Sequence, residues 1–505
     1  MVYKIKVAFW IVGLVALVET GLNAQGMLTY VPPVLTSKPC KDTTSLIITT
    51  ASDAREREKE QKKPYLNTVQ IIDADQSWPP RWYNNTPLYT DEMFAEDNSK
   101  NLYRFDYIID AKVDGGYFSY YEILSRQSKG TGQLINPKLA GYILLNEKME
   151  AVDTAKSNTK RRNLYYHDFR INEKGERLVN LRKDTYLDMR DYTDNQDDSA
   201  IHCNIDYIQI IDKDDKILFS WNPLEHVPAD LFRYKSILSQ RAFGAKNSDL
   251  IEWTRLTSAV WDYDGNILYS MKNIGIGKIS RVDGHIIWHV DYTDIPLTEK
   301  TGNMEWYNQH DFNFLYDNDS VATYSLFSNG DADMNKIACG VVFEIMKKDT
   351  KFKLVKYVYP KRKYFSNGQG NLDYSKNGNY VIAYGSFDEP DSVTTEFWSA
   401  FEYGKNDSTY AVFLFPRWNQ CYKAHRLENW PKPPRPVIIK NGGVLEVSGP
   451  KEMKNFTWYQ LSGDDNTNIT KVADGNSIKP QKGAKYCVEG QYGVGFSVSR
   501  VYWNK

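Results

Sequence analysis

The chain has 505 residues, with 63 Lys and Arg against 64 Asp and Glu, so its formal net charge is −1. Charges of both signs are mixed along the sequence, which leaves no global field to attract nucleic acid or an anionic membrane surface. Hydrophobic residues make up 41% and aromatic residues 14% of the chain. This composition provides a large core and favours β-structure, and the length fits one large repeat fold with a small additional module.

The first residues have the pattern of an export signal. Two lysines precede an apolar run over residues 7–18, and small residues follow up to Ala24. The pattern predicts a signal peptide over 1–24, followed by a lead-in segment over 25–44, and hence a secreted protein, periplasmic or extracellular. The apolar run is shorter than the roughly 20 residues that span a membrane, so no stable span is expected after cleavage. An uncleaved N-terminal anchor is the alternative.

Short apolar and aromatic runs alternate with Asp-Gly or Asn-Gly turns from about residue 45 onwards. Thr68–Asp73 is one such run, and Ala259–Trp261 leads through Asp264–Asn266 into Ile267–Tyr269. Asp-Gly and Asn-Gly tolerate the positive φ that two-residue hairpin turns require. Groups of about four strands recur every ~50–60 residues, which favours a propeller over a series of sandwiches. We predict a six-bladed β-propeller over residues 45–428.

The C-terminal part has a different pattern. Residues 429–437 are rich in proline, which favours an extended linker and marks a domain boundary. Beyond it, Val444–Val447 and Phe456–Gln460 have the pattern of strands, and Gly483–Val488 resembles the tyrosine-corner strand of an immunoglobulin-like sandwich. We predict a small Ig-like β-sandwich over 438–505. The predicted fold class is therefore all-β, a six-bladed β-propeller followed by an Ig-like module.

The cysteines are few and widely spaced, at Cys40, Cys203, Cys339, Cys421 and Cys487. None forms a CxxC motif, so a zinc or thioredoxin-type site has no support. Export permits one or two disulfides, and the odd count leaves at least one thiol over. The sequence contains no Walker-type phosphate loop and no dinucleotide fingerprint. We predict no metal and no cofactor.

Two of the seven histidines precede an aspartate at the start of a predicted strand. His167-Asp168 and His310-Asp311 fall in separate predicted blades. The inner strand of each propeller blade faces the central channel, so residues at equivalent strand starts converge there. From spacing alone, a structural His–Asp hydrogen bond is the commoner explanation of such a pair.

Several motifs occur in the order found in the arylsulfotransferase family, which is unrelated to the sulfotransferases that use a nucleotide sulfate donor. The motifs that resemble the family are His167–Gly175, Asp206–Asp212 with Ile217–Trp221, Glu252–Ser258 with Asp264–Asn273, and Gln309–Asp311. The resemblance implies transfer of a sulfuryl group from a phenolic sulfate ester to a phenolic acceptor through a sulfo-histidine intermediate. It therefore implies a small-molecule aryl sulfate and a phenol as partners, and it allows a homodimer.

The resemblance also assigns residues to the site. It makes His310 the nucleophile, and the residues that it places with His310 in the catalytic site are His167, Arg255 and Lys272. The residues to which it assigns substrate contacts are Thr257, Asn273 and Asn371.

Four positions depart from the family's pattern. Arg255 stands where the family has a second active-site histidine, Lys272 where it has an arginine, and Glu252 and Thr257 replace an Asp and an Asn. Arg255 and Lys272 can still hold an anionic sulfate, but Arg cannot act as a general acid at neutral pH, and Lys lacks the bidentate fork of Arg. Two functions stay open: a sulfuryl-transferring enzyme, and a non-catalytic secreted propeller that binds anionic or sulfated ligands in its central channel.

Overall fold

The computed structural model describes residues 27–31, 33–38, 46–53, 68–73, 78–85, 118–122, 141–155, 163–190, 196–227, 250–272, 274–290, 305–330, 337–359, 365–366, 368–375, 378–385, 396–404, 409–416, 419–427, 430–464 and 466–505. Their regular structure is nearly all β, which confirms the all-β prediction. Short helical segments include η1 (Met27–Tyr30) and α4 (Pro223–His226). In the described part, no helix has the length and apolar character needed to cross a membrane. The predicted signal peptide and Cys40 lie outside the described residues.

Three antiparallel sheets follow one another in the middle of the chain, and strands adjacent in sequence pair within each. The first contains β8 (Asn163–Ile171), β9 (Arg177–Leu187), β10 (Ile201–Ile211) and β11 (Ile217–Trp221), with β12 (Leu250–Glu252) parallel to β10. The second contains β13 (Leu256–Trp261), β14 (Ile267–Met271), β15 (Gly275–Ile279) and β16 (Ile286–Val290). The third contains β17 (His310–Asp317), β18 (Val321–Ser328), β19 (Cys339–Met346) and β20 (Phe352–Val358).

Two further sheets combine strands that are far apart in the sequence. One contains β21 (Asn371–Tyr374), β22 (Tyr380–Ala383), β23 (Glu396–Tyr403), β24 (Thr409–Pro416) and, paired with β24, the N-terminal β1 (Leu35–Lys38). In the other, the strands are β2 (Leu46–Asp53), β3 (Thr68–Asp73), β4 (Trp82–Asn85), β25 (Asn419–Gln420) and β26 (Ala424–Leu427). A three-stranded sheet contains β5 (Phe118–Glu122), β6 (Gly141–Leu145) and β7 (Ala151–Ala155). N-terminal strands thus complete the sheets that hold the last strands before the proline-rich segment.

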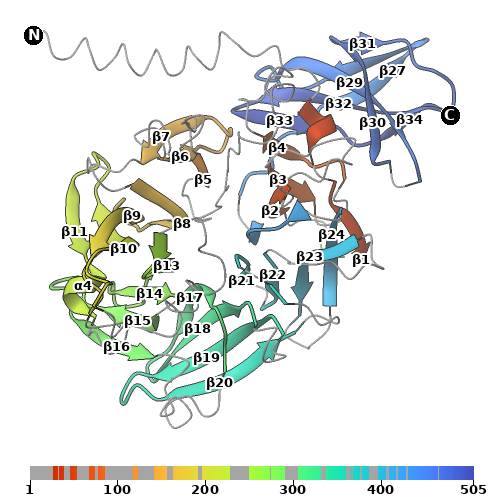
Figure 1. Ribbon diagram of the computed structural model, residues 1–505. Helices are drawn as coiled ribbons and strands as arrows, with labels where there is room; N and C mark the ends of the chain where they lie inside the picture. Colours follow the sequence, from red (N-terminus) through yellow and green to blue (C-terminus); the bar gives the residue numbers. More distant parts are fainter. Residues whose placement is uncertain are drawn as a thin grey trace, which may run out of the picture.

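The first strands of neighbouring sheets meet around one centre (Figure 1). β13 packs against both β8 and β17, and β21 packs against β17 and β26. The hairpin turn expected at Asp264–Asn266 is present. In the β13–β14 turn, Gly265 has φ +79°, and its N–H donates to the carbonyl of Asp262 at 3.0 Å. Polar side chains at the inner ends of these strands are therefore brought together near the centre.

The C-terminal strands form one sheet of their own and extend another. β27 (Val437–Asn441), β28 (Val444–Ser448) and β31 (Ser477–Ile478) make the small sheet. The strands that extend the β2–β4 sheet are β33 (Gly495–Val498), β32 (Lys485–Tyr492), β29 (Lys454–Ser462), β30 (Asn468–Asp474) and β34 (Tyr502–Trp503). The junction is the antiparallel pairing of β33 with β4 (Figure 1). The last strands of the chain are thus hydrogen-bonded to N-terminal ones.

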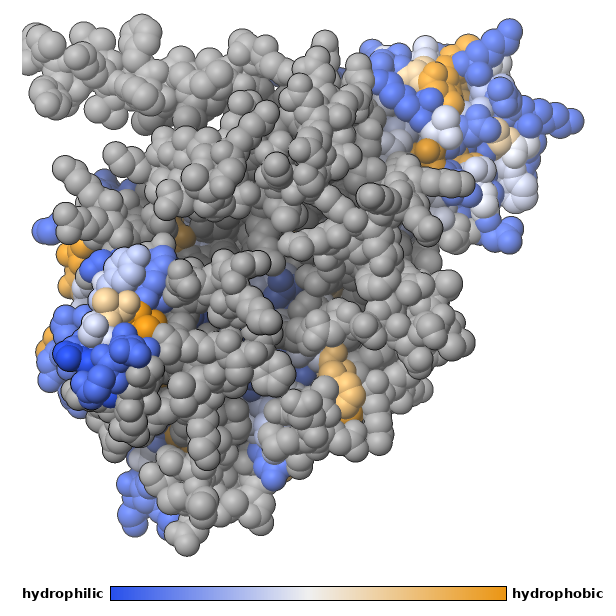
Figure 2. Space-filling model, in the orientation of Figure 1, coloured by the Kyte–Doolittle hydropathy of each residue, from blue (hydrophilic) through white to orange (hydrophobic). Residues whose placement is uncertain are grey.

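Buried polar groups reinforce this junction. The carboxylate of Asp73 accepts hydrogen bonds from Arg81 at 2.7 Å and Arg435 at 3.0 Å. Glu489 is buried on β32, and its two oxygens accept from the hydroxyls of Tyr83 and Tyr459, each at 2.5 Å. On the face shown in Figure 2, the surface of the C-terminal strands is mostly hydrophilic, with small hydrophobic patches between the hydrophilic residues.

Candidate functional site

Both His-Asp pairs lie on inner strands where the β-ladder is irregular. His310 is the first residue of β17, and the pairing of β17 with β18 shifts between His310 and Asn313. His167 is inside β8 rather than at its start, but the pairing of β8 with β9 shifts between Leu164 and Phe169, around this pair. Such irregularities re-aim side chains and are common beside active sites.

The backbone around these residues also departs from ordinary strand geometry. Asn308 has φ +49°, Asp311 has φ +52° and Arg255 has φ +46°. The left-handed region is uncommon for residues other than glycine, and Asn and Asp adopt it more readily than most, so Arg255 has the least favourable conformation of the three. Two predicted site segments, one around Arg255 and one around His310, therefore hold unfavourable conformations that their surroundings must stabilise.

A network of hydrogen bonds fixes the tautomer of His310. The side-chain N–H groups of Asn329 donate to the carbonyl of Gln369 at 2.9 Å and to the hydroxyl of Ser366 at 2.8 Å. A carbonyl can only accept, so the amide nitrogen of Asn329 must face it, and Oδ1 of Asn329 must face His310. His310 Nδ1 lies 2.5 Å from this Oδ1 and 3.2 Å from the carbonyl of Asn308. Since both partners are acceptors, Nδ1 carries the proton, and Nε2 of the neutral ring has a free lone pair.

The surroundings of His310 keep it neutral. Burial, followed by the positive charges of Arg255 and Lys272, lowers the pKa of His310 to about 3, against opposing hydrogen bonds to Asn308 and Asn329. The ring of His167 lies close by, with ring centroids 6.0 Å apart. Burial and the nearby cationic groups also lower the pKa of His167 well below its usual value. At neutral pH the site therefore contains two uncharged imidazoles.

Arg255, one of the two predicted cations, is at the end of a chain of ion pairs. Arg255 Nε lies 3.2 Å from Glu252, and Glu252 also accepts from Arg182 at 2.9 Å. Arg182 in turn donates two hydrogen bonds to the carboxylate of the buried Asp206, in a bidentate ion pair. Burial raises the pKa of Glu252, but the charges of Arg255, Arg182 and Lys272 outweigh it and hold this pKa below its usual value. Arg255 is therefore a fixed cation, partly exposed and supported by Glu252.

Two of the residues predicted to contact substrate make contacts within the protein. Thr257 is buried, and its hydroxyl lies 3.1 Å from the carbonyl of Gln309, the residue before His310. Asn371 is also buried, and its amide accepts from the N–H of Ala424 at 2.8 Å and donates to the carbonyl of Ala424 at 2.9 Å. The third, Asn273, lies outside the described residues. Thr257 and Asn371 thus hold backbone next to site residues.

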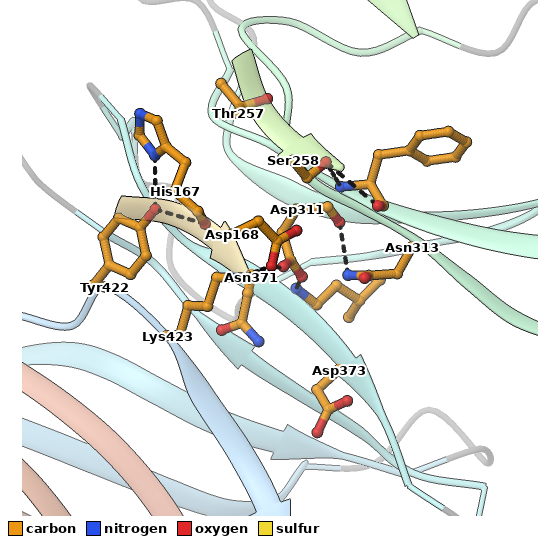
Figure 3. A network of polar contacts seen from close by, with 12 residues as sticks. His167, Asp168, Thr257, Ser258, Asp311, Asn313, Asn371, Asp373, Tyr422 and Lys423 are labelled. Carbon is orange, nitrogen blue, oxygen red and sulfur yellow. Dashed lines mark hydrogen bonds and ion pairs between the residues drawn. The ribbon is translucent and has the colours of Figure 1, made fainter. Parts of the chain in front are cut away.

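Two further residues at the centre, Tyr422 and Lys423, precede β26 and are marked by no sequence motif (Figure 3). The hydroxyl of Tyr422 lies 2.7 Å from His167 Nδ1. Lys423 is buried, with its ammonium 3.1 Å from Asp311 and 3.5 Å from Asp168. Both aspartates of the His-Asp motifs are therefore paired with the same lysine.

The described cysteines are all buried, namely Cys203, Cys339, Cys421 and Cys487. Burial raises the pKa of Cys339 to about 12. Cys339 is therefore held as the neutral thiol, which is a poor nucleophile.

The sequence model of the arylsulfotransferase (ASST) family matches residues 131–395, more than half of the chain. The chain belongs to the arylsulfotransferase family. The matched region contains His167, Arg255, Lys272 and His310, and it ends before Lys423. Family membership points to an arylsulfotransferase-type function.

Among solved structures, this arylsulfotransferase-family chain is similar to a protein of unknown function from Bacteroides caccae, at 11% identity and a TM-score of 0.41, covering 75% of this chain and 99% of the other. It is also similar to sucrose-6-phosphate hydrolase from Lactobacillus gasseri, at 12% identity and a TM-score of 0.31, covering 78% of each chain. A search of curated proteins gives no match.

Proposed function

We propose that this chain transfers a sulfuryl group from a phenolic sulfate ester to a phenolic acceptor, with His310 as the nucleophile. The observation that carries the proposal is the fixed tautomer of His310. Asn329 holds the proton on Nδ1, so Nε2 has its lone pair available, and burial with nearby cations keeps the ring neutral. A nucleophilic imidazole needs both conditions.

The reaction has two displacements at sulfur. In the first, the lone pair of His310 Nε2 attacks the sulfur, the bond from sulfur to the aryl oxygen breaks, and the electron pair leaves with the phenolate. In the second, the acceptor oxygen attacks the sulfur of sulfo-His310, the N–S bond breaks, and its electron pair returns to Nε2. The phenol proton passes to His167 or to water. Splitting the transfer in this way is ordinary covalent catalysis.

The cations have two roles in this scheme. Arg255 and Lys272 are the positive groups whose charges act on His310. The same charges can stabilise the sulfuryl oxygens as negative charge builds on them. Because Arg stays protonated at neutral pH, Arg255 supplies charge rather than protons. Proton transfer to and from the phenol is left to His167 and solvent.

We further propose that residues 45–428 form a six-bladed β-propeller with this site in its central channel. The arrangement of sheets around a common centre and the packing of first strands against one another support it (Figure 1). Residues 438–505 are proposed as an Ig-like sandwich built on the buried Trp458, joined by the segment 429–437. The sequence signal at residues 1–24 supports export to a periplasmic or extracellular location.

A chromogenic phenyl sulfate with a phenol acceptor tests the function. The wild type should release the chromogenic phenol, and an acid-quenched sample should contain a His310 peptide heavier by one sulfuryl group. His310→Ala should lose both signals. His285→Ala is the matched control, because His285 is an exposed histidine paired with Asp283 on a turn. Binding of the aryl sulfate that Arg255→Ala abolishes, without product or sulfurylated peptide in the wild type, would instead identify a non-catalytic binding protein.

A further inference from the structure

We propose that the segment Cys421–Ala424 positions the two active-site histidines relative to each other, with Lys423 tying Asp168 to Asp311 and Tyr422 holding His167. The inference rests on the proposed sulfuryl transfer for its activity readout, but the geometry is independent of that reaction. It concerns residues beyond the part of the chain that the family model matches.

Lys423 joins two strands that otherwise belong to different sheets. Its side chain is 3% exposed, and the side chains of Asp168 and Asp311 are 0% and 1% exposed. Such burial excludes the solvent screening that makes surface ion pairs weak. Each aspartate follows a site histidine directly in the chain. Figure 3 shows Lys423 beside Asp168 and Asp311. Fixing these carboxylates therefore fixes the backbone from which His167 and His310 project.

The charges around Lys423 are balanced. Asp168 also lies 3.4 Å from Arg170, so two cations face two carboxylates. The second oxygen of Asp311 accepts from the N–H of Leu372 at 3.2 Å. Lys423 thus links β8, β17 and the segment before β26, while Leu372 adds β21 to the same network.

The segment that carries Lys423 is itself held on both sides. Asn371 makes a pair of hydrogen bonds to the backbone of Ala424, at 2.8 and 2.9 Å. The carbonyl of Tyr422 accepts from the N–H of Gly370 at 3.1 Å. Gly370 and the preceding residue belong to the loop that holds Asn329, the partner of His310. One connected network therefore reaches both imidazoles.

Tyr422 completes the network at His167. Its hydroxyl lies 2.7 Å from Nδ1 and 3.4 Å from the carbonyl of His167. Besides burial, the groups that lower the pKa of His167 electrostatically lie on several elements: Arg182, Arg255 and Lys423, together with His310 where it is protonated. Removing the ammonium of Lys423 should therefore move the titration of His167 to higher pH, since a nearby positive charge disfavours imidazolium.

The test compares Lys423→Met with Lys278→Met. Lys278 is also a buried lysine between two aspartates, 2.5 Å from Asp262 and 2.6 Å from Asp264, on β15. Both variants should lose thermal stability. Only Lys423→Met should lower kcat, by about 100-fold, with KM for the aryl sulfate within about two-fold, because misplaced reacting groups lower the rate of the chemical step. Equal kcat and equal pH profiles in the two variants would overturn the inference.

Two measurements keep the inference testable if Lys423→Met does not fold or if the wild type does not transfer sulfuryl groups. Tyr422→Phe removes one hydroxyl and keeps Lys423; it should lower kcat about ten-fold, and wild-type kcat in this variant would overturn the inference. NMR titration of His167 needs no activity. Its midpoint should rise in Lys423→Met and stay at the wild-type value in Lys278→Met, whereas an unchanged midpoint in both contradicts the proposed role of Lys423.

Discussion

Lowering the pH from about 7.5 to about 5 should leave the sulfurylation of His310 nearly unchanged, because its pKa lies far below this range. With a pKa of about 3, roughly 99% of His310 is neutral at pH 5, whereas an ordinary histidine with a pKa of 6.5 would be only about 3% neutral. The measurement is kcat/KM for phenol release from an aryl sulfate, which reports the free enzyme. A fall in kcat/KM with a midpoint near pH 6.5 would refute the argument that burial and nearby cations set the state of His310.

Removing the charge of Arg255 should make the sulfurylation of His310 depend on pH. Arg255→Gln removes the larger of the two charge effects on His310, so the pKa of His310 should rise and an acid limb should appear within the measurable range. Arg281→Gln is the control. Arg281 forms an ion pair with Glu176 at 2.6 Å, and it is not among the charges that lower the pKa of His310. Similar profiles for the two variants would show that Arg255 is not a cause of the lowered pKa.

The stability of the folded chain, unlike the sulfurylation step, should depend on pH in this range. Below about pH 6.5 the unfolded chain takes up protons on His167 and His310, whereas the folded chain does so only at much lower pH. The free energy of unfolding should therefore fall as the pH is lowered from 6.5, by up to about 1.4 kcal/mol per pH unit for each histidine. Denaturant melts of the wild type and His310→Ala compare this slope, which should be smaller in the variant.

Three other substitutions test separate parts of the structure. Asn329→Ala should lower kcat and cost about 2–3 kcal/mol in denaturant melts, since it removes the acceptor of His310 and two donated hydrogen bonds. Glu489→Gln should remove a loss of stability that the wild type shows as the pH rises from about 4.5 to about 7, because burial raises the pKa of Glu489 to about 7 and only the unfolded chain ionises it readily in this range; an unchanged pH–stability curve would contradict this. Gly370→Ala should reduce Tm and kcat, because Gly370 has φ +89° and an added Cβ would meet the Phe327 ring at 2.5 Å.

The strands and turns could be predicted from the sequence because their signals are local. Thr68–Asp73 is a strand with the bounds expected, and the Asp-Gly turn at Gly265 joins β13 to β14. The approach of His167 to His310 could also be anticipated, since each lies on the inner strand of its own sheet. Periodicity and turn chemistry determine these features, and both are visible within about ten residues.

The roles of individual polar residues could not be predicted in the same way. A polar side chain on an inner strand looks the same in sequence whether it faces a ligand or the backbone of the next sheet. Thr257 and Asn371 are expected from the sequence to contact substrate, and the structure adds hydrogen bonds from their side chains to the carbonyls of Gln309 and Ala424, which no sequence pattern indicates. Tyr422 lies 255 positions from His167 in sequence, and no local motif marks such a partner.

Arg255 stands where the family has a histidine. This difference affects proton transfer in the site more than it affects anion binding. A titratable histidine at this position could exchange protons with the phenol, and its charge would vary with pH. Arg255 is always charged, so it keeps His310 neutral over a wider pH range, and in the proposed reaction it would also hold the sulfate. Binding of an anionic sulfate would offset the positive charge and let the pKa of His310 rise. In the proposed reaction this arrangement favours formation of sulfo-His310, and the acidity of the acceptor phenol, together with His167, would govern the second transfer.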